Sequence, residues 1–362
     1  MTAILAHDHD FVGKVSQDGT DRNGEAAMVS VVAVARRAGV SPATVSRVLG
    51  GRVPVTAETR VRVLDAIEEL GYRPNEVART LRAGRGRSLA LVIADIQQGI
   101  NAVLAKNMQR MLELQGLDLL LFDLDHRQDR LRDILERAPS LGLRGLLLSS
   151  PHIMDMTPLL PALRTSVERG IEVFSVSQDL SALGITSVVH DDAGGARIAV
   201  AHLLARQSAP IAFVGRVSTS AIGRARFDGY RHALREHGQP VDPSLVWDIS
   251  EGFRADAGYR ATSEALDRGL RFRSVLAASD ELALGCMAAA ADRGLSIPAD
   301  IAFIGFGGLG LGGFVRPPIT AVFLDVDAQT RTVCSLLGAG RSSAGSTQCH
   351  LIPTQFVRRQ SA

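Results

Sequence analysis

The sequence predicts a small all-α domain near the N-terminus, followed by a large α/β core built on doubly wound parallel sheets. Residues 31–49 have the pattern of two short helices joined by a tight turn. From Ser88 onward, apolar runs alternate with amphipathic helical patterns, which is typical of buried parallel strands joined by crossover helices. With 362 residues, the chain is long enough for two or three domains with sizeable cores.

The two-helix unit has the turn chemistry of a helix-turn-helix motif. Gly39 stands where such a turn needs a residue that tolerates a positive φ. Ser41 is a good N-cap, and Pro42 occupies the first helical position, where its missing N–H costs nothing. The apolar positions at helical spacing are Val31, Val34, Ala35 and Ala38 in the first helix, and Val45, Val48 and Leu49 in the second. An ordinary helical hairpin in an enzyme core is the alternative.

The second helix leaves Pro42, Ala43, Thr44, Ser46 and Arg47 facing outward. A third helix is predicted over Glu58–Leu70, with Thr56 as its cap, Gly71 at its end and Val63, Ala66, Ile67 and Leu70 as its apolar positions.

Positive charge is concentrated around these helices. Residues 29–87 hold 11 Arg, no Lys and 5 Asp or Glu, a net charge of +6, whereas the whole chain carries only +2. A basic segment beside a groove-reading helix is expected of a phosphate-binding surface, although a run of charge can also be a solvated face.

The segments AGVSPATVSRVL and AIEELGYRPNEVARTLRAGR resemble the headpiece and hinge of the LacI/GalR family, the lactose/galactose-repressor family of transcriptional regulators. The resemblance runs from about Val29 to Ser361. It implies that the helix beginning at Pro42 is the recognition helix, and that residues 75–82 become a hinge helix when two subunits meet on DNA. It also implies that Leu81 wedges between base steps in the minor groove next to Ala78. The predicted DNA contacts are Ser41, Pro42, Ala43, Thr44, Ser46, Arg47, Asn75, Ala78 and Leu81.

Composition fits a cytoplasmic, nucleoid-associated protein. No apolar run approaches a membrane span, and the first 27 residues lack the features of a signal peptide. The three cysteines lack the spacing of a disulfide framework or zinc site, and we expect no cofactor or metal. The predicted organisation is a tail or upstream start over 1–28, the helix-turn-helix domain over 29–74, a hinge over 75–87 and the core over 88–362.

Seven apolar runs predict buried parallel strands in the core: SLALVIA, DLLLF, GLLLS, VFSVS, PIAFVG, SVLAAS and IAFIG. An amphipathic helix is predicted over Asn101–Leu114. The resemblance implies two similar doubly wound subdomains joined by crossing strands, as in a periplasmic sugar-binding protein, with LIPTQFVRRQS as the last strand. It also implies an effector cleft between the subdomains, where ligands of such sheets bind, and a homodimer.

The residues that follow the strands depart from the family pattern. Aromatic and acidic positions of the family are replaced, whereas Arg226 and Phe253 match its pocket arginine and pocket aromatic. An arginine without acidic company suits an anionic effector, and a neutral effector or an unused cleft are the alternatives. Asp280 is the expected acidic neighbour of Arg226. The predicted effector contacts are Asp95, Gln97, Gln98, Asn101, Ser177, Gln178, Arg226, Phe253, Ser279, Asp280 and Gly307.

A different class of function was weighed because Gly305–Gly310 matches GxGxxG directly after a strand. That fingerprint requires a helix to follow, and Pro317 and Pro318 come too soon for one. We therefore predict a non-enzymatic regulator, most simply a repressor, that binds double-stranded operator DNA as a homodimer and is controlled by a small-molecule effector. The alternatives are a dinucleotide-dependent enzyme and a regulator without an effector.

Overall fold

The computed structural model describes residues 30–50, 55–72, 86–149, 156–250, 252–308, 310–339 and 348–362. They belong to two compact units, Met1–Glu76 and Val77–Ala362. The predicted tail and most of the predicted hinge lie outside the described residues. The domain boundaries placed there from the sequence therefore stay predictions.

The first unit is a bundle of three short helices whose ends follow local sequence signals. Ser30 and Thr56 accept hydrogen bonds from the first turns of the helices that they precede. Gly39 and Gly71 end the same helices in the left-handed conformation, with φ of 64° and 60°. The elements are α1 (Val31–Ala38), α2 (Pro42–Gly50) and α3 (Ala57–Leu70). The structure thus confirms the predicted helical unit, and α3 begins one residue earlier than predicted.

One apolar face of each helix forms the centre of this unit. The fully buried side chains are the ones that the helical spacing selects: Val34, Ala35 and Ala38 from α1, Val45 and Val48 from α2, and Val63 and Ala66 from α3. Since these positions hold α2 against the other two helices, its opposite face is left free.

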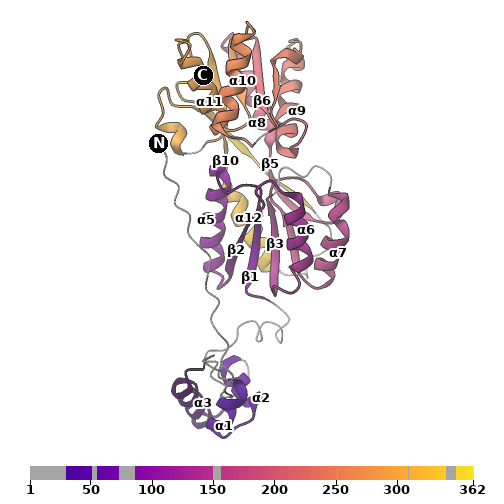
Figure 1. Ribbon diagram of the computed structural model, residues 1–362, viewed down its shortest axis with the longest axis vertical. Helices are drawn as coiled ribbons and strands as arrows, with labels where there is room; N and C mark the ends of the chain where they lie inside the picture. The colour runs from indigo at the N-terminus through magenta and orange to yellow at the C-terminus, as the bar shows by residue number, and fades with distance from the viewer. Residues whose placement is uncertain are drawn as a thin grey trace, which may run out of the picture. The chain divides into compact units, whose positions relative to one another are not determined.

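The second unit contains two six-stranded sheets, each with helices packed against it (Figure 1). The first sheet has the strand order β11-β5-β4-β3-β1-β2, and the second has the order β12-β10-β9-β8-β6-β7. Both orders require crossover connections, which confirms two doubly wound subdomains. All pairs are parallel except β10 with β12, which are antiparallel, so the second sheet is mixed.

The first subdomain contains β1 (Ser88–Ile93), α5 (Gly99–Glu113), β2 (Asp118–Asp123), α6 (Gln128–Arg137), β3 (Leu143–Ser149), α7 (Leu160–Glu168), β4 (Glu172–Ser175), β5 (Thr186–His190), α12 (Val326–Ala339) and β11 (Cys349–Ile352). The second contains α8 (Asp192–Ala205), β6 (Ile211–Gly215), α9 (Ala221–Glu236), β7 (Val246–Asp248), α10 (Ala255–Asp267), β8 (Ser274–Ala277), α11 (Asp280–Ala291), β9 (Ala302–Gly307), β10 (Thr320–Leu324) and β12 (Thr354–Val357). Short 3₁₀ turns lie at Thr157–Leu159, Ser181–Leu183, Pro243–Leu245 and Gly310–Gly313.

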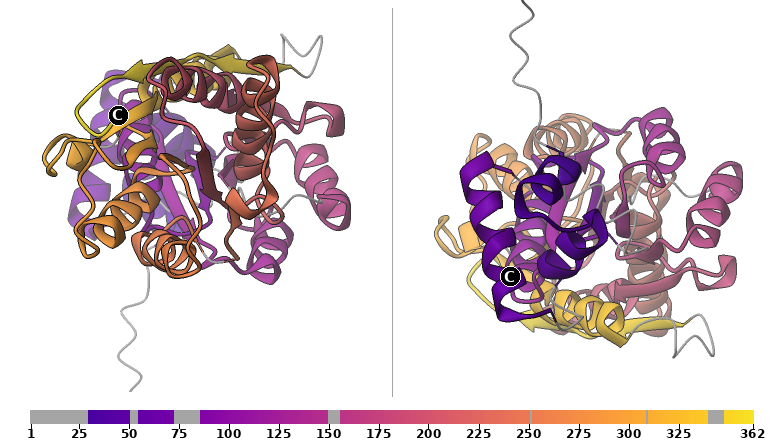
Figure 2. Two further views of the ribbon diagram at one scale, coloured as in Figure 1. Left: turned by 90° about the horizontal axis from the view of Figure 1, so that it is seen from above. Right: turned by 90° about the horizontal axis from the view of Figure 1, so that it is seen from below.

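The chain crosses between the two subdomains three times. It passes from β5 to α8, from β10 to α12, and from β11 to β12. The last two strands run along one edge of the unit as a yellow ribbon (Figure 2). The predicted final strand is therefore two strands, because Pro353 between them has no N–H to donate to a ladder.

The strand prediction is otherwise correct but incomplete. All seven predicted runs form strands, and the predicted helix after the first strand is α5. Three short strands, β5, β7 and β10, have no counterpart among the predicted runs. β5 begins with two hydroxyl residues and β7 has only three residues, so neither gives a long apolar run. Among the described residues, no helix is long and apolar enough to span a membrane.

Candidate functional sites

The free face of α2 carries the residues predicted to contact DNA. Pro42, Ala43, Ser46 and Arg47 are exposed, and Thr44 is half-buried. The Ser41 hydroxyl accepts a hydrogen bond from the Thr44 amide at 3.1 Å and pairs with the Thr44 hydroxyl at 2.9 Å. The start of the helix is therefore fixed by its own cap, while the side chains beyond it face solvent.

Arg47 is available to an external partner. Within the described part of the helical unit, Arg37 is held by Glu69 at 2.5 Å, whereas no ion pair is recorded for Arg47. An exposed arginine on a helix that projects from a small basic domain can donate two hydrogen bonds to a guanine edge. Asn75, Ala78 and Leu81 lie outside the described residues, and their predicted contacts stay predictions.

A second site lies at the carboxyl ends of the strands, between the two subdomains. It is a cavity of about 80 Å³. Aromatic and aliphatic side chains form much of its wall, and polar groups enter from both subdomains. The lining residues are Gln98, Ile100, Asn101, Leu104, Ser149, Val176, Ser177, His190, Asp192, Ile222, Arg226, Phe253, Ser279, Glu281, Phe306, Gly307, Leu324, Val326 and Gln329. We call it the core pocket.

The core pocket contains seven of the eleven residues predicted to contact an effector: Gln98, Asn101, Ser177, Arg226, Phe253, Ser279 and Gly307. Four others lie nearby but do not line it: Asp95, Gln97, Gln178 and Asp280. Asp95 instead accepts a hydrogen bond from the Gln97 amide at 2.7 Å. Asp280 is buried in the first turn of α11 and lies against Gly305. No direct contact with a ligand is established for any of the eleven.

The sequence-based view of Arg226 was wrong in one respect, because this side chain has an acidic partner. Its Nε donates to Asp192 Oδ1 at 2.8 Å, and the two side chains are only 7% and 9% exposed. Its Nη1 donates to the Ala278 carbonyl, and its guanidinium lies 4.4 Å from the centre of the Phe306 ring. Asp192 therefore neutralises Arg226, so the argument for an anionic effector loses its premise.

Three polar atoms of the core pocket are buried without a hydrogen-bond partner among the described residues. They are Gln98 Nε2, Ser177 Oγ and His190 Nε2. A buried polar group without a partner is costly, so such atoms point to water or a ligand. Burial also lowers the pKa of His190 despite the opposing effect of Asp192, which favours the neutral ring.

Two hydrogen bonds cross from one subdomain to the other beside the core pocket. The Gly99 amide at the start of α5 donates to Glu281 Oε1 of α11 at 3.0 Å. Arg254 Nη1 donates to Gln97 Oε1 at 2.9 Å. Gln98 is the residue before α5, but its side chain makes no cap hydrogen bond. The Glu281 carboxylate, which belongs to the other subdomain, therefore caps the N-terminus of α5 in its place. These bonds join the two subdomains beside the pocket.

Sequence reasoning did not identify His190, Asp192, Glu281, Phe306 and Gln329 as pocket residues. His190 ends β5 and Asp192 begins α8, so both depend on a crossing that the sequence analysis did not locate. Gln329 Nε2 donates to the carbonyls of Val176 and Val188 at 2.9 and 2.8 Å. Because β5 was not predicted, the sequence offered no strand-end signal for His190.

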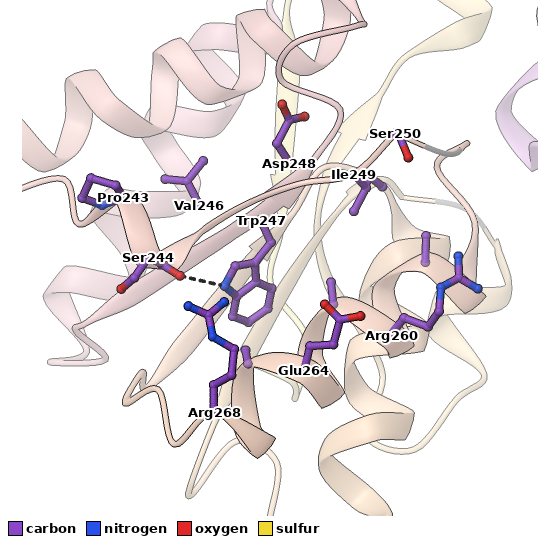
Figure 3. Close-up of a pocket in the computed structure, with 13 residues that line it drawn as sticks. Pro243, Ser244, Val246, Trp247, Asp248, Ile249, Ser250, Arg260, Glu264 and Arg268 are labelled. Carbon is purple, nitrogen blue, oxygen red and sulfur yellow. Dashed lines mark hydrogen bonds between the residues drawn. The ribbon is translucent and has the colours of Figure 1, made fainter.

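A larger depression of about 390 Å³ lies at the outer edge of the second sheet (Figure 3). Trp247 of β7 lies at its centre and donates to the Ser244 carbonyl at 3.2 Å. Glu264 of α10 and Arg268, which directly follows α10, project beside the indole ring in Figure 3, and both are exposed. This depression is open to solvent, whereas the core pocket encloses unsatisfied polar atoms. The core pocket is therefore the stronger candidate for ligand binding.

The sequence matches two family models. Residues 32–75 match bacterial regulatory proteins of the lacI family, and residues 166–362 match the periplasmic binding protein-like domain. Catabolite control protein A of Priestia megaterium is 32% identical over 302 residues, which are 81% of this chain and 87% of that protein. The chain belongs to the lacI family.

Other relatives agree with this assignment. The regulator AscG of Escherichia coli K12 is 30% identical to this chain, and the match covers 86% of this chain and 91% of AscG. Among solved structures, a complex of the regulator CelR with cellobiose has a TM-score of 0.68 and 26% identity, covering 92% of this chain and all of that one. A lac repressor structure has a TM-score of 0.80 at 23% identity, covering 92% and 99%, and supports the fold.

The lacI-family chain is thus a DNA-binding transcriptional regulator with an effector-binding core. Its relatives are transcriptional regulators, and the helix-turn-helix model covers α1 to α3, including the free face of α2.

Proposed function

We propose that this protein represses transcription as a homodimer that binds a near-palindromic operator and responds to a small neutral effector in the core pocket. The free face of α2 is the observation that carries the DNA-binding part of the proposal. It presents an arginine that has no ion-pair partner among the described residues, together with small side chains that allow a close approach to base edges.

We propose that the residues predicted from the sequence to contact DNA are the ones that contact the operator. Pro42, Ala43 and Arg47 contact base edges, whereas Ser41, Thr44 and Ser46 lie where they can contact the phosphate backbone. Asn75, Ala78 and Leu81 are proposed to act in the minor groove on the basis of the family resemblance alone. Two copies of α2 then meet two half-sites related by a two-fold axis.

Exposed apolar side chains on the core support a homodimer. Phe314 and Leu114 are each 80% exposed, and Leu311 is 73% exposed. Large apolar side chains that are this exposed favour burial against a second subunit.

The effector is proposed to be neutral because the one arginine of the core pocket is already paired with Asp192. The Glu281 carboxylate also lines the pocket, and neutral hydrogen-bonding groups supply the remaining polar lining. Hydroxyl-bearing compounds such as sugars fit this surface, as in the relative solved with cellobiose. A ligand larger than a few atoms requires the subdomains to separate, because about 80 Å³ holds only a few water molecules.

Separation of the subdomains would break the bonds of Gly99 to Glu281 and of Gln97 to Arg254. Because these bonds belong to the closed form, a ligand that favours a different separation changes the population of that form. We propose that the change is passed to the hinge segments of the dimer and so alters operator affinity.

Mutation of Arg47 tests the DNA-binding proposal. On a duplex selected by the wild-type chain, Arg47→Ala is expected to lower affinity by a factor that corresponds to about 1–3 kcal/mol and to relax specificity at one base position of each half-site. Arg235→Ala, which removes the same charge from an exposed position of α9, is the matched control and should change neither. Unchanged specificity in Arg47→Ala would refute the assigned role of α2.

We also propose that the chain is not an enzyme. Gly305 and Gly307 belong to β9, and the described residues after them form only a four-residue 3₁₀ turn over Gly310–Gly313 before β10. That turn cannot present the helix N-terminus that a pyrophosphate requires. A fluorescence titration of Trp247 with nicotinamide cofactors should therefore show no saturable change.

A further inference from the structure

His190 occupies a position in the core pocket where its two ring nitrogens meet different surroundings. It is the last residue of β5, directly before the crossing to α8. The Gln329 amide holds the Val188 carbonyl two residues earlier, at 2.8 Å. The end of this strand is therefore fixed, and the imidazole lies in the pocket wall by virtue of the fold.

One ring nitrogen of His190 is already used. The ring donates a hydrogen bond to the backbone carbonyl of Asp325, at the crossing from β10 to α12. Nε2 is buried and has no partner among the described residues, so the nitrogen that donates to Asp325 is Nδ1. The backbone bond thus selects the tautomer.

Nearby charges do not favour a protonated ring strongly enough to offset burial. The charged groups around His190 are Asp192, Arg226 and Asp325. Asp192 and Arg226 form an ion pair with each other, so their effects on the imidazole oppose one another. Burial has the largest effect, and it lowers the pKa of His190 below its ordinary value. A neutral ring with its proton on Nδ1 leaves a lone pair on Nε2.

We propose that His190 Nε2 is the hydrogen-bond acceptor that selects an effector with a hydroxyl or N–H group. The inference rests on the proposed role of the core pocket as the effector site. Carboxylate and phosphate oxygens that carry no proton cannot donate to Nε2, whereas a sugar hydroxyl can. Gln98 Nε2, which also has no partner among the described residues, offers a donor from the same subdomain, just before α5. A hydroxyl group can donate to His190 Nε2 and accept from Gln98 Nε2, so it matches both atoms.

The tautomer can be measured without any ligand. In full-length protein labelled with ¹⁵N-histidine, long-range ¹H–¹⁵N correlation spectra at pH 7.5 distinguish the two neutral tautomers and the charged ring. Loss of one set of signals in His190→Gln assigns them. We expect His190 to be neutral with its proton on Nδ1. A proton on Nε2, or a charged ring, would overturn the proposal.

His202 provides the matched control for the assignment. Its Nε2 is also buried without a partner among the described residues, but it lies outside the core pocket and packs at 4.9 Å from Phe356. Its signals should be unchanged by His190→Gln. They should also be unchanged by any ligand that shifts those of His190.

Binding of defined probes tests the selectivity. The probes are cellobiose, D-glucose and acetate, whose only polar group is a carboxylate, measured by calorimetry with the wild type and three variants. For a probe that binds the wild type, His190→Phe should lower affinity about tenfold or more, because the ring shape remains but the acceptor is lost. His190→Gln, which restores an acceptor, should recover most of the affinity, and His202→Phe should have no effect.

Equal binding of a probe by the wild type and His190→Phe would overturn the proposal, as would an effector whose only polar group is an anion. If none of the three probes binds, the tautomer measurement decides alone. Operator binding and the effect of Arg47→Ala do not depend on His190. A failure of this inference is therefore distinguishable from a failure of the proposed function.

Discussion

The buried pair of Asp192 and Arg226 gives the sharpest prediction for stability. Asp192→Ala removes a carboxylate that is 9% exposed and accepts from Arg226 at 2.8 Å. The guanidinium then keeps the Ala278 carbonyl and the Phe306 ring but loses its counter-charge in a buried position. Breaking a buried pair on one side costs about 3–5 kcal/mol, which is much more than an exposed pair would cost.

Thermal unfolding followed by circular dichroism measures this effect. For a domain of this size, each kcal/mol corresponds to roughly 2–4 °C in Tm, so Asp192→Ala should lower the Tm of the core by roughly 6–20 °C. Asp191→Ala is the matched control at the neighbouring position, where the carboxylate accepts from the Gly194 amide at 2.9 Å. Loss of that helix cap should cost only about 1 kcal/mol.

A double substitution shows whether the lost stability comes from the unpaired charge of Arg226 or from other changes around the pair. Asp192→Leu combined with Arg226→Met replaces both charges with apolar side chains, which is often neutral for a buried pair, and should recover most of the lost stability. A fall of less than 1 kcal/mol in Asp192→Ala would refute the reasoning. So would a double variant that is less stable than the single one.

Three further predictions test packing, the hinge and the closed pocket. Gly285→Ala should destabilise the core by about 1–3 kcal/mol in urea unfolding, because the new Cβ would lie 1.7 Å from the Ala255 carbonyl, whereas Gly310→Ala faces open space and should have little effect. Leu81→Ala should weaken specific DNA binding far more than non-specific binding in gel-shift titrations, and equal losses would show that Leu81 is structural. Glu281→Gln should speed amide hydrogen exchange at the start of α5, because the Gly99 amide loses a charged acceptor. The control Glu264→Gln should leave this exchange unchanged. Unchanged exchange in Glu281→Gln would show that this bond does not hold the cleft closed.

The helical unit was predicted almost completely because its signals are local. Gly39, Ser41 and Thr56 each act within a few residues of the helix end that they define. The burial of Val45 and Val48 follows from helical spacing alone. Local sequence patterns are sufficient for a small unit of this kind.

The core pocket was predicted less completely because it depends on long-range geometry. Asp192 lies 34 positions before Arg226 and begins a helix after a strand that gives no strong apolar run. Glu281 meets Gly99 across 182 positions, and only the closed arrangement of the subdomains brings them together. Position near a strand end and the family resemblance together identified seven of the lining residues, but they could not tell which charges pair with each other.

Selection of duplexes from a random DNA pool, followed by footprinting and measurement of stoichiometry, tests the central claim most directly. The account predicts one enriched site with two-fold symmetry, two chains per duplex and a flexible pyrimidine–purine step at its centre. No enrichment, or an asymmetric site occupied by a single chain, would contradict it.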